Sequence, residues 1–248
     1  MEWLVSGLVI DMEAKVEADL RDLQEKVVSC RRCSRLIRHI SAVARLKVPR
    51  YKDWKYWGKP LPSFGDPHAQ LLVVGLAPAA HGGNRTGRMF TGDASGDWLI
   101  RALYETKFAN QSCSVSRNNG LELTSAYITA IVRCAPPKNK PTKQEILNCS
   151  EYLVGELELL KNVRVVLTLG RIAFDTYVRV AKTERGRRLK FRHGSIHTLA
   201  EDTPLLAVSY HPSRQNTQTG RLKWRVWLKV FEDIRRILDR SEVQGVIV

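Results

Sequence analysis

The stretch "QLLVVGLAPAAHGGNRTGRMFTGD", residues 70–93, joins an apolar run to a glycine-rich loop. The apolar part, residues 70–77, is typical of a strand buried on both faces of a sheet. The loop has neither the Gly-Lys-Ser/Thr ending of a P-loop nor the glycine spacing of a dinucleotide-binding loop. It therefore predicts a ligand site of another kind, in which glycines let the backbone approach the ligand closely.

Three further apolar runs predict strands, and amphipathic patterns between them predict helices. The strands are expected within residues 125–137, 163–170 and 204–213, and the helices within 13–30, 95–108, 141–161, 171–182 and 220–240. Such alternation indicates an α/β fold, here three α/β/α layers with a four-stranded parallel sheet flanked by helices. We expect a single domain over residues 1–248, with residues 31–67 as an irregular, basic and aromatic surface segment.

Three unusual segments follow predicted strands. They are the loop that ends at Asp93, the segment "CAPPKNKP" at 134–141, and the segment "HPSRQNTQTGR" at 211–221. Ligands of open parallel sheets bind beyond the carboxyl ends of the strands. The topology therefore predicts that these three segments share one site.

The chain is strongly basic, with 40 Lys and Arg against 25 Asp and Glu, a formal net charge of +15. This excess favours an anionic partner, with nucleic acid the leading candidate. The alternative is a solvated basic surface without a partner. No apolar run approaches the roughly 20 residues that a membrane span needs, and the first residues lack the features of a signal peptide. We expect a cytoplasmic protein without a membrane contact.

Four cysteines have a spacing that suits a metal centre. They are Cys30, Cys33, Cys134 and Cys149. Four thiolates bind tetrahedral zinc or an iron–sulfur cluster, and the wide second spacing favours a cluster. Arg31, Arg32 and Arg133 flank them and are expected to offset thiolate charge. Two disulfides or reduced core cysteines are the alternatives, and Cys113 has no partner spacing.

These motifs and the cysteine order resemble the uracil-DNA glycosylase superfamily, and most closely its family 5, the type B thermophile and archaeal enzymes. The resemblance implies hydrolysis of the N-glycosidic bond of uracil in DNA, which leaves an abasic site. It also implies a [4Fe-4S] cluster. Since this hydrolysis calls for no electron and no Lewis acid, we expect the cluster to be structural.

The sequence departs from the related family 4 at two places. Family 4 enzymes read G-E-A-P-G and I-T-N where this chain has "GLAPA" and "ITA". Ala77, Ala79 and Ala130 thus stand in a pocket where relatives keep polar groups. A pocket with fewer hydrogen-bonding demands rejects fewer bases, so hypoxanthine and xanthine are expected as further substrates.

The resemblance also implies roles for individual residues. Phe90 would stack on a flipped base, and His211 would donate a hydrogen bond to a base oxygen. Asp93 and Asn139 would hold the attacking water, although Asp93 is equally placed to cap a helix that begins near Ser95. The candidate residues for binding the base are Gly75, Ala77, Ala79, His81, Asn84, Phe90 and Ala130.

The segment after His211 is expected to contact DNA. Its candidate residues are Ser213, Arg214, Gln215, Asn216 and Arg221. In this superfamily the corresponding loop enters the minor groove, so Arg214 is the expected wedge and Ser213 the expected phosphate contact. The basic residues within 183–198 form a second candidate contact, with a solvated face as the alternative.

Two other functions compete with the glycosylase. A non-catalytic iron–sulfur protein that binds nucleic acid is one, because the first motif lacks a carboxylate. An enzyme acting on small nucleotides is the other, but a small ligand explains neither the net charge nor the wedge loop. The expected partner is DNA containing uracil or other deaminated bases, bound by a monomer. A sliding clamp is a further candidate partner, although the sequence carries no clear clamp-binding motif.

Overall fold

The centre of the molecule is a sheet with the strand order β1-β3-β2-β4-β6-β5. The computed structural model describes residues 2–181 and 189–244. Four parallel strands form its middle: β2 (Leu71–Gly75), β3 (Ala126–Ala130), β4 (Val165–Leu169) and β6 (Leu205–Ser209). The predicted parallel core is thereby confirmed.

The sheet is wider than the four strands predicted. Two short strands, β1 (Phe64–Gly65) and β5 (Ile196–His197), add to its edges. Strand β1 pairs with β3 and β5 pairs with β6, both antiparallel. A strand of two residues has no periodic pattern, so neither strand could be predicted from the sequence.

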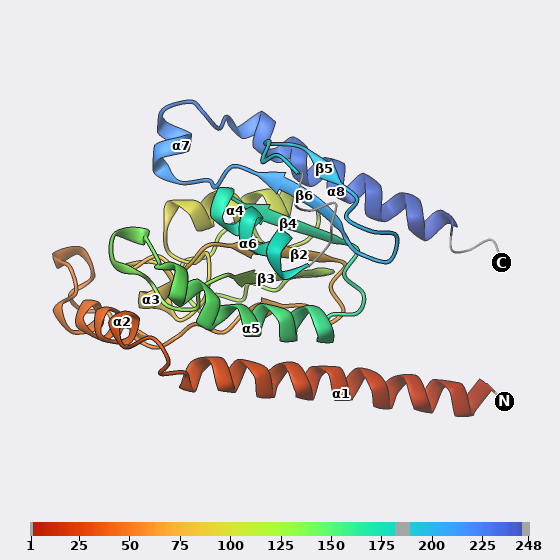
Figure 1. Cartoon of the computed structure of the whole chain (residues 1–248), viewed down its shortest axis with the longest axis horizontal. Helices are drawn as coiled ribbons and strands as arrows, with labels where there is room; N and C mark the ends of the chain where they lie inside the picture. Colours follow the sequence, from red (N-terminus) through yellow and green to blue (C-terminus); the bar gives the residue numbers. More distant parts are fainter. Residues whose placement is uncertain (1, 182–188, 245–248) are drawn as a thin grey trace.

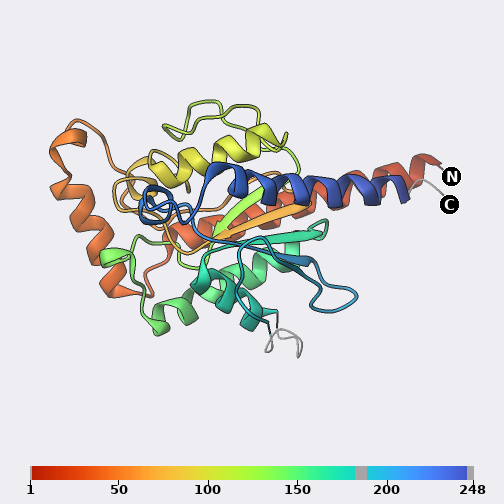
Figure 2. The same ribbon diagram turned by 90° about the horizontal axis from the view of Figure 1, so that it is seen from above.

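Helices cover both faces of the sheet, as predicted for three layers (Figure 1). Helices α1 (Glu2–Ser29), α5 (Lys143–Leu159) and α6 (Arg171–Val180) pack on one face. Helices α4 (Ala94–Glu105) and α8 (Trp224–Gln244) pack on the other. Both views place the start of α1 and the end of α8 at the same end of the molecule (Figure 1; Figure 2).

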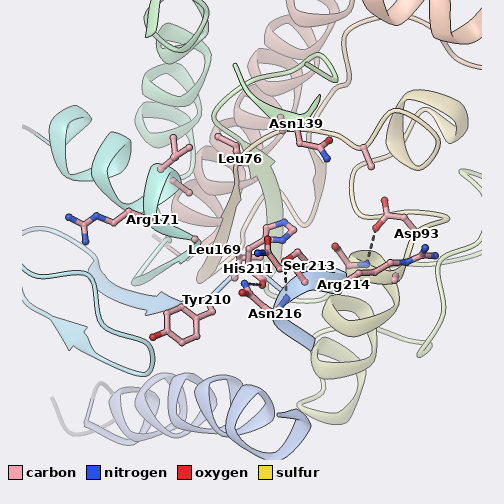
Figure 3. A pocket seen from close by; sticks show the side chains of 18 of the residues that line it. Leu76, Asp93, Asn139, Leu169, Arg171, Tyr210, His211, Ser213, Arg214 and Asn216 are labelled. Atoms are coloured by element: carbon pink, nitrogen blue, oxygen red, sulfur yellow. Dashed lines mark hydrogen bonds between the residues drawn. The ribbon is translucent and has the colours of Figure 1, made fainter. Parts of the chain in front are cut away.

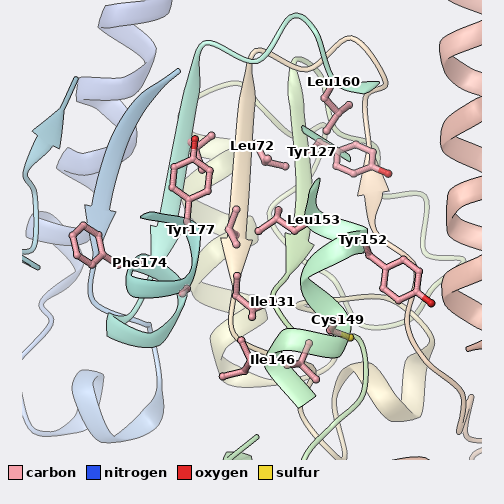
Figure 4. Packing of buried hydrophobic residues seen from close by; sticks show 14 of the residues in the cluster. Leu72, Tyr127, Ile131, Ile146, Cys149, Tyr152, Leu153, Leu160, Phe174 and Tyr177 are labelled. Atoms are coloured by element: carbon pink, nitrogen blue, oxygen red, sulfur yellow. The ribbon is translucent and has the colours of Figure 1, made fainter. Parts of the chain in front are cut away.

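Alternation along the strands feeds two separate cores. In β2, Leu72 and Val74 join the core beneath α5 and α6, whereas Leu71 and Val73 join the core beneath α4 and α8. Figure 4 shows the first of these cores, where Leu153 of α5 packs beside the sheet. Because neighbouring residues point to opposite faces, continuous apolar runs are required in these strands.

The expectation of an irregular segment at 31–67 is wrong for part of its length. Residues Ser34–Leu46 form helix α2, and Pro49–Tyr51 form a short 3-10 helix, η1. Leu36 and Ile40, one turn apart, are the buried side chains of α2. The basic residues around them, among them Arg35, Arg38 and His39, obscured this helical spacing in the sequence.

The loops at the carboxyl ends of the strands also hold short helices. These are α3 (Gly83–Thr86), η2 (Pro137–Asn139) and α7 (Arg214–Gln218). The predicted capping box of α5 is confirmed, with Thr142 Oγ1 accepting from the Glu145 amide and Glu145 Oε2 accepting from the Thr142 amide.

Of the basic loop at 183–198, residues 183–188 lie outside the described part. No helix within residues 2–181 and 189–244 combines the length and apolar character that crossing a membrane requires.

Candidate active site

A cavity of about 720 Å³ opens at the carboxyl ends of the parallel strands (Figure 3). The loops after β2, β3 and β6 all contribute to its wall, so the structure brings the three predicted segments together. The candidate residues that line it are Ala77, Ala79, Asp93, Asn139, His211, Ser213, Arg214, Gln215, Asn216 and Arg221. A smaller pocket of about 40 Å³ adjoins it and adds Phe90 and Ala130.

Phe90 occupies a strained backbone position in the wall of the small pocket. Its φ angle is 49°, which lies in the left-handed region that bulky residues rarely adopt. Two glycines make room for it. A Cβ atom at Gly75 would stand 2.9 Å from the Phe90 ring, and one at Gly96 would overlap the Phe90 carbonyl oxygen. Such strain persists where the surrounding structure enforces it, as at ligand sites.

His211 follows β6 and faces Phe90 across the small pocket. The two ring centroids are 6.1 Å apart, with the planes tilted by 31°. Burial lowers the pKa of His211 to about 4, because a charged imidazole is poorly solvated there. The ring is therefore neutral near pH 7 and able to donate one hydrogen bond. Asn216 Nδ2 donates to the His211 carbonyl oxygen at 2.8 Å and fixes this turn.

Asp93 caps helix α4 and also lines the cavity, so the helix-cap interpretation is confirmed. Its Oδ1 accepts hydrogen bonds from the Ser95 and Gly96 amides, each at 3.0 Å. Its Oδ2 lies against Gly82, where a Cβ atom would overlap it. Burial raises the pKa of Asp93, and the two amide hydrogen bonds act against that rise. One carboxylate oxygen is thus engaged in the fold, which leaves the other for a ligand or water.

Asn139 reaches the cavity from the loop after β3 (Figure 3). It ends the turn η2, and both it and Lys138 have left-handed backbone angles, with φ values of 56° and 54°. Asn is among the few residues that adopt this conformation at small cost. The turn exposes the Asn139 side chain at the mouth of the cavity.

Three residues expected to bind the base lie elsewhere. Asn84 is fully buried, and its Nδ2 donates to the Ile40 carbonyl oxygen at 3.2 Å, so it joins α3 to α2. His81 bonds through Nδ1 to Tyr56 Oη at 3.0 Å and lines a neighbouring groove. Gly75 lies behind the Phe90 ring and lines neither pocket. Other residues of the same loop line the two pockets, whereas Asn84, His81 and Gly75 do not.

The segment after His211 divides into inward and outward residues. Ser213 Oγ accepts from the Asn216 amide at 3.4 Å and caps α7. The Asn216 side chain turns inward to His211, as described above. Arg214 and Gln215 are exposed at the cavity mouth. Arg221 lies over the Tyr210 ring, with its guanidinium carbon 4.6 Å from the ring centroid.

An aromatic wall of the cavity was not predicted. Tyr210 and Phe191 have ring centroids 5.8 Å apart, and Arg171 lies 5.8 Å from the Phe191 ring centroid. Ile172 extends the same wall. Tyr210 could have been found because it directly precedes His211, whereas Phe191 lies in a segment whose charge dominated its interpretation.

The four predicted cysteine ligands gather in one region. All are free thiols, and Cys134 and Cys149 are buried. Burial raises the pKa of Cys134, and the neighbouring Cys149, Cys30 and Cys33 raise it further. Burial likewise raises the pKa of Cys149 to about 11. Because these cysteines raise one another's pKa, and all four pack in the same core, their sulfur atoms lie close together although they come from three separate segments.

A hydrogen-bond donor points at one of these sulfur atoms, with Asn148 Nδ2 3.5 Å from Cys33 Sγ. The Arg133 backbone amide acts against the rise in the pKa of Cys149, and burial and the nearby Cys30 raise the pKa of Tyr152. Within the described residues, no three His, Cys, Asp or Glu side chains converge as they would around a single metal ion. An iron–sulfur cluster is larger and takes each thiolate at its own iron atom.

The Arg133 charge acts against the rise in the pKa of Cys149, as expected, but the side chain also has a partner that was not predicted. It is buried and pairs with Glu156, with Nη2 and Oε2 2.6 Å apart. Thr129 Oγ1 donates to the same carboxylate oxygen, and Ser63 Oγ contacts the guanidinium. The Arg133 charge is thus offset by Glu156. Arg32, in turn, pairs with Glu151 on the surface.

The family model described as "Uracil DNA glycosylase superfamily" matches residues 62–235, a range that holds every element of the cavity. The chain belongs to this superfamily. The match also covers Cys134 and Cys149, while Cys30 and Cys33 precede it. The predicted resemblance is therefore confirmed at the level of the superfamily.

Curated relatives narrow the assignment within the superfamily. A type-5 uracil-DNA glycosylase of Pyrobaculum aerophilum is 46% identical over 81% of this chain and 85% of its own length. One of Thermus thermophilus is 44% identical over 86% and 95%. A type-4 uracil-DNA glycosylase of Sulfurisphaera tokodaii is 29% identical over 61% and 54%. The identity is higher for these type-5 relatives than for the type-4 relative, as the two sequence departures from family 4 predicted.

Proposed function

We propose that this protein is a monofunctional DNA glycosylase that hydrolyses the N-glycosidic bond of uracil in DNA and leaves an abasic site. The similarity to type-5 uracil-DNA glycosylases supports the reaction class. The observation that carries the proposal is the meeting of Phe90, Asp93 and His211 around one small pocket. Acting on genomic DNA, such an enzyme works inside the cell.

The small pocket is suited to a flipped base. A target atom inside a duplex is inaccessible, so the nucleotide has to rotate out of the stack. The Phe90 ring offers an aromatic face for that base, and its strained backbone holds the ring in place. Met89 and Pro78 close the pocket with apolar atoms.

His211 would stabilise the leaving base. When the bond between C1′ and the base nitrogen breaks, its electron pair moves to the base and develops on a base oxygen. A neutral imidazole N–H pointed at that oxygen lowers the barrier without a proton transfer. The low pKa of His211 supports this role, because the ring keeps one N–H donor and no charge.

Asp93 and Asn139 would position the water that forms the new bond to C1′. Asp93 Oδ1 is fixed by α4, so its orientation is set before the substrate binds. The second oxygen, Oδ2, accepts a hydrogen bond from the water, and Asn139 holds the same water from the loop after β3. The carboxylate also offsets the positive charge that develops on the sugar.

We further propose a broad base range that includes hypoxanthine and xanthine. Ala77, Ala79 and Ala130 line the small pocket and offer no side-chain hydrogen bond. A wrong base leaves no polar side chain unpaired at these positions, so discrimination against it is weak.

Arg214 and Gln215 would act as the wedge that fills the gap left by the flipped nucleotide, since both are exposed beside the pocket. Arg221 and the net charge of +15 support phosphate contacts along the strand. The monomeric state and the sliding-clamp contact both stay predictions.

A [4Fe-4S] cluster fits the cysteine region. Cys30, Cys33, Cys134 and Cys149 would hold it, and the Asn148 amide near the Cys33 sulfur is the kind of donor that surrounds such clusters. The bound cluster would supply a crosslink between the α1–α2 junction, the loop after β3 and helix α5. The proposed hydrolysis uses none of these residues.

The reaction is tested with a labelled oligonucleotide that carries one uracil, incubated without added metal or nucleotide and then treated with alkali. A strand break at the uracil is expected, while the matched thymine oligonucleotide stays intact. An intact uracil strand under conditions where the protein is folded would overturn the proposal. A hypoxanthine oligonucleotide in the same assay tests the base range.

A further inference from the structure

A second groove adjoins the active-site cavity, and the proposed reaction does not use it. Its volume is about 630 Å³. Residues of the aromatic segment at 48–54 form one side, and we name it the Trp54 groove. It shares Ala79, Asp93, Asn139 and Arg214 with the main cavity. Whatever lies in this groove is therefore continuous with the reacting nucleotide.

Trp54 presents an aromatic surface at this groove. The side chain is 38% exposed, although large apolar groups are usually covered. The guanidinium of Arg85 lies 4.1 Å from the Trp54 ring centroid and 3.9 Å from that of Tyr51. The two rings stand nearly perpendicular, at 77°, so Arg85 occupies the corner between them.

Arg85 connects this aromatic corner to the catalytic loop. Its Nε donates to the His81 carbonyl oxygen at 2.7 Å, and its Nη2 donates to the Gly92 carbonyl oxygen at 3.0 Å. Gly92 directly precedes Asp93. The exposed Trp54 is thus held in a fixed position relative to the proposed water-binding carboxylate.

The exposed cations of the groove suit a nucleic-acid backbone. Arg50 and Arg214 are exposed along it and Arg85 is buried, while the carboxylates of Asp93 and Asp97 line the part next to α4. Within the described residues, Arg85 Nη1 is buried without a hydrogen-bond partner. Cations that alternate with an exposed aromatic face are the pattern of a site for single-stranded nucleic acid.

We propose that the Trp54 groove binds the nucleotide next to the one being excised, with its base stacked on Trp54 and its phosphate near Arg50 and Arg214. The inference rests on the proposed function, since it names a further part of the same substrate. In duplex DNA the neighbouring base is already stacked and paired. The groove therefore acts on single-stranded DNA, where that base is free to turn onto Trp54.

The test measures binding of single-stranded oligonucleotides whose uridine carries a 2′-fluoro group, which resists cleavage. Fluorescence anisotropy gives Kd for oligonucleotides with a base or an abasic analogue as the neighbour, on either side. Trp54→Ala should weaken binding roughly tenfold when the neighbouring base is present, from the usual contribution of one stacked base. When the abasic analogue replaces the neighbouring base on the side that lies in the Trp54 groove, the wild type and Trp54→Ala should bind with equal Kd.

Matched variants separate stacking from folding. Trp54→Phe keeps an aromatic face and should retain most of the affinity, whereas Trp54→Leu should behave like the alanine variant. Tyr104→Ala removes another exposed aromatic side chain, on helix α4, and should change nothing. An equal loss for Trp54→Ala with and without the neighbouring base, or an equal loss on duplex DNA, would overturn the proposal.

Because the fluorinated strand is not cleaved, binding is independent of catalysis. If the wild-type protein shows this stacking signature yet leaves ordinary uracil strands intact, the proposed function fails and the subsite stands. If it cleaves uracil strands and the Trp54 variants bind like wild type, the subsite fails and the function stands.

Discussion

Gly82 makes room for Asp93: a Cβ atom at position 82 would occupy the place of the Asp93 Oδ2 atom. The carboxylate cannot retreat without losing the two amide hydrogen bonds that its Oδ1 accepts at the start of α4. A glycine and an acid eleven residues apart thus define one functional position. The pairing explains why the loop needs a glycine there.

Gly82→Ala should lower the excision rate by displacing Asp93 Oδ2, and Asp93→Asn should lower it without displacing anything. Loss of a positioned acid or base typically costs about 100-fold or more. Single-turnover rates check both variants, and Gly155→Ala in helix α5 serves as the control. An undiminished excision rate for Asp93→Asn would show that the Asp93 carboxylate takes no part in the chemical step.

The pH dependence of His211 should differ from that of an ordinary histidine. Its pKa of about 4 in the folded protein lies below the usual value of 6.5. The unfolded chain therefore takes up a proton first, so the His211 contribution to stability is complete above pH 6.5 and is lost as the pH falls towards 4. The neutral ring, and with it the proposed hydrogen bond, should persist down to about pH 5.

NMR titration of the His211 ring checks this prediction directly, because each histidine gives its own signal. His211→Gln keeps a neutral N–H donor and provides the assignment. The excision rate has a second titrating group in Asp93, whose raised pKa also affects the acid limb. A midpoint for His211 near 6.5 would contradict the proposed neutral donor.

Ala130→Asn should narrow the base range. Ala130 ends β3 and lines the small pocket, so an amide there demands a matching base edge and takes up space. Hypoxanthine, the larger base, should lose roughly tenfold or more relative to uracil, as one unpaired polar group or steric conflict typically costs. The ratio of the two single-turnover rates measures this. Ala94→Ser, at the wider cavity, should leave the ratio unchanged.

The buried ion pair behind β3 should be a sensitive point for stability. Glu156→Gln leaves the Arg133 charge buried without its partner, and such losses cost about 3 to 5 kcal/mol. Asp233→Asn breaks a surface pair with Lys229 and should cost less than about 1 kcal/mol. Urea unfolding of both variants gives the comparison. A cost below 1 kcal/mol for Glu156→Gln would mean that Arg133 finds another partner.

Cys149→Ser should remove the proposed cluster and lower the melting temperature, while Cys113→Ala should do neither. Cys113 is exposed in a polar loop, and Cys149 is buried beside the other three cysteines. Iron and sulfide analysis with the visible absorbance spectrum detects the cluster. A Cys149→Ser protein without iron that keeps its melting temperature would show that the centre is not structural.

The sequence predicted what depends on local pattern and on strand topology. The runs that contain Leu71–Gly75 and Val165–Leu169 are apolar without interruption, so their burial was readable, and with it the edge where the site forms. The cap at Asp93 and the capping box at Thr142 were readable because each is completed within three residues.

Other features were unreadable because their partners are distant in the chain. Arg133 pairs with Glu156 only because β3 and α5 pack together, and nothing near Arg133 in the sequence indicated this second partner. Asn84 stands in the expected motif but turns towards Ile40 of α2, a helix that the sequence did not reveal. A motif therefore located the loop correctly without fixing which side chains in it face the ligand.

The order of the elements along the chain is also the order in which they are synthesised. All four cysteines have been added to the chain once residue 149 is made, whereas β6 and His211 follow more than fifty residues later. Strand β6 then adds beside β4, away from β3, whose end carries the third cysteine. A nascent chain could acquire the proposed cluster while its active site still lacks His211. The cluster would then be bound before the protein is able to excise a base.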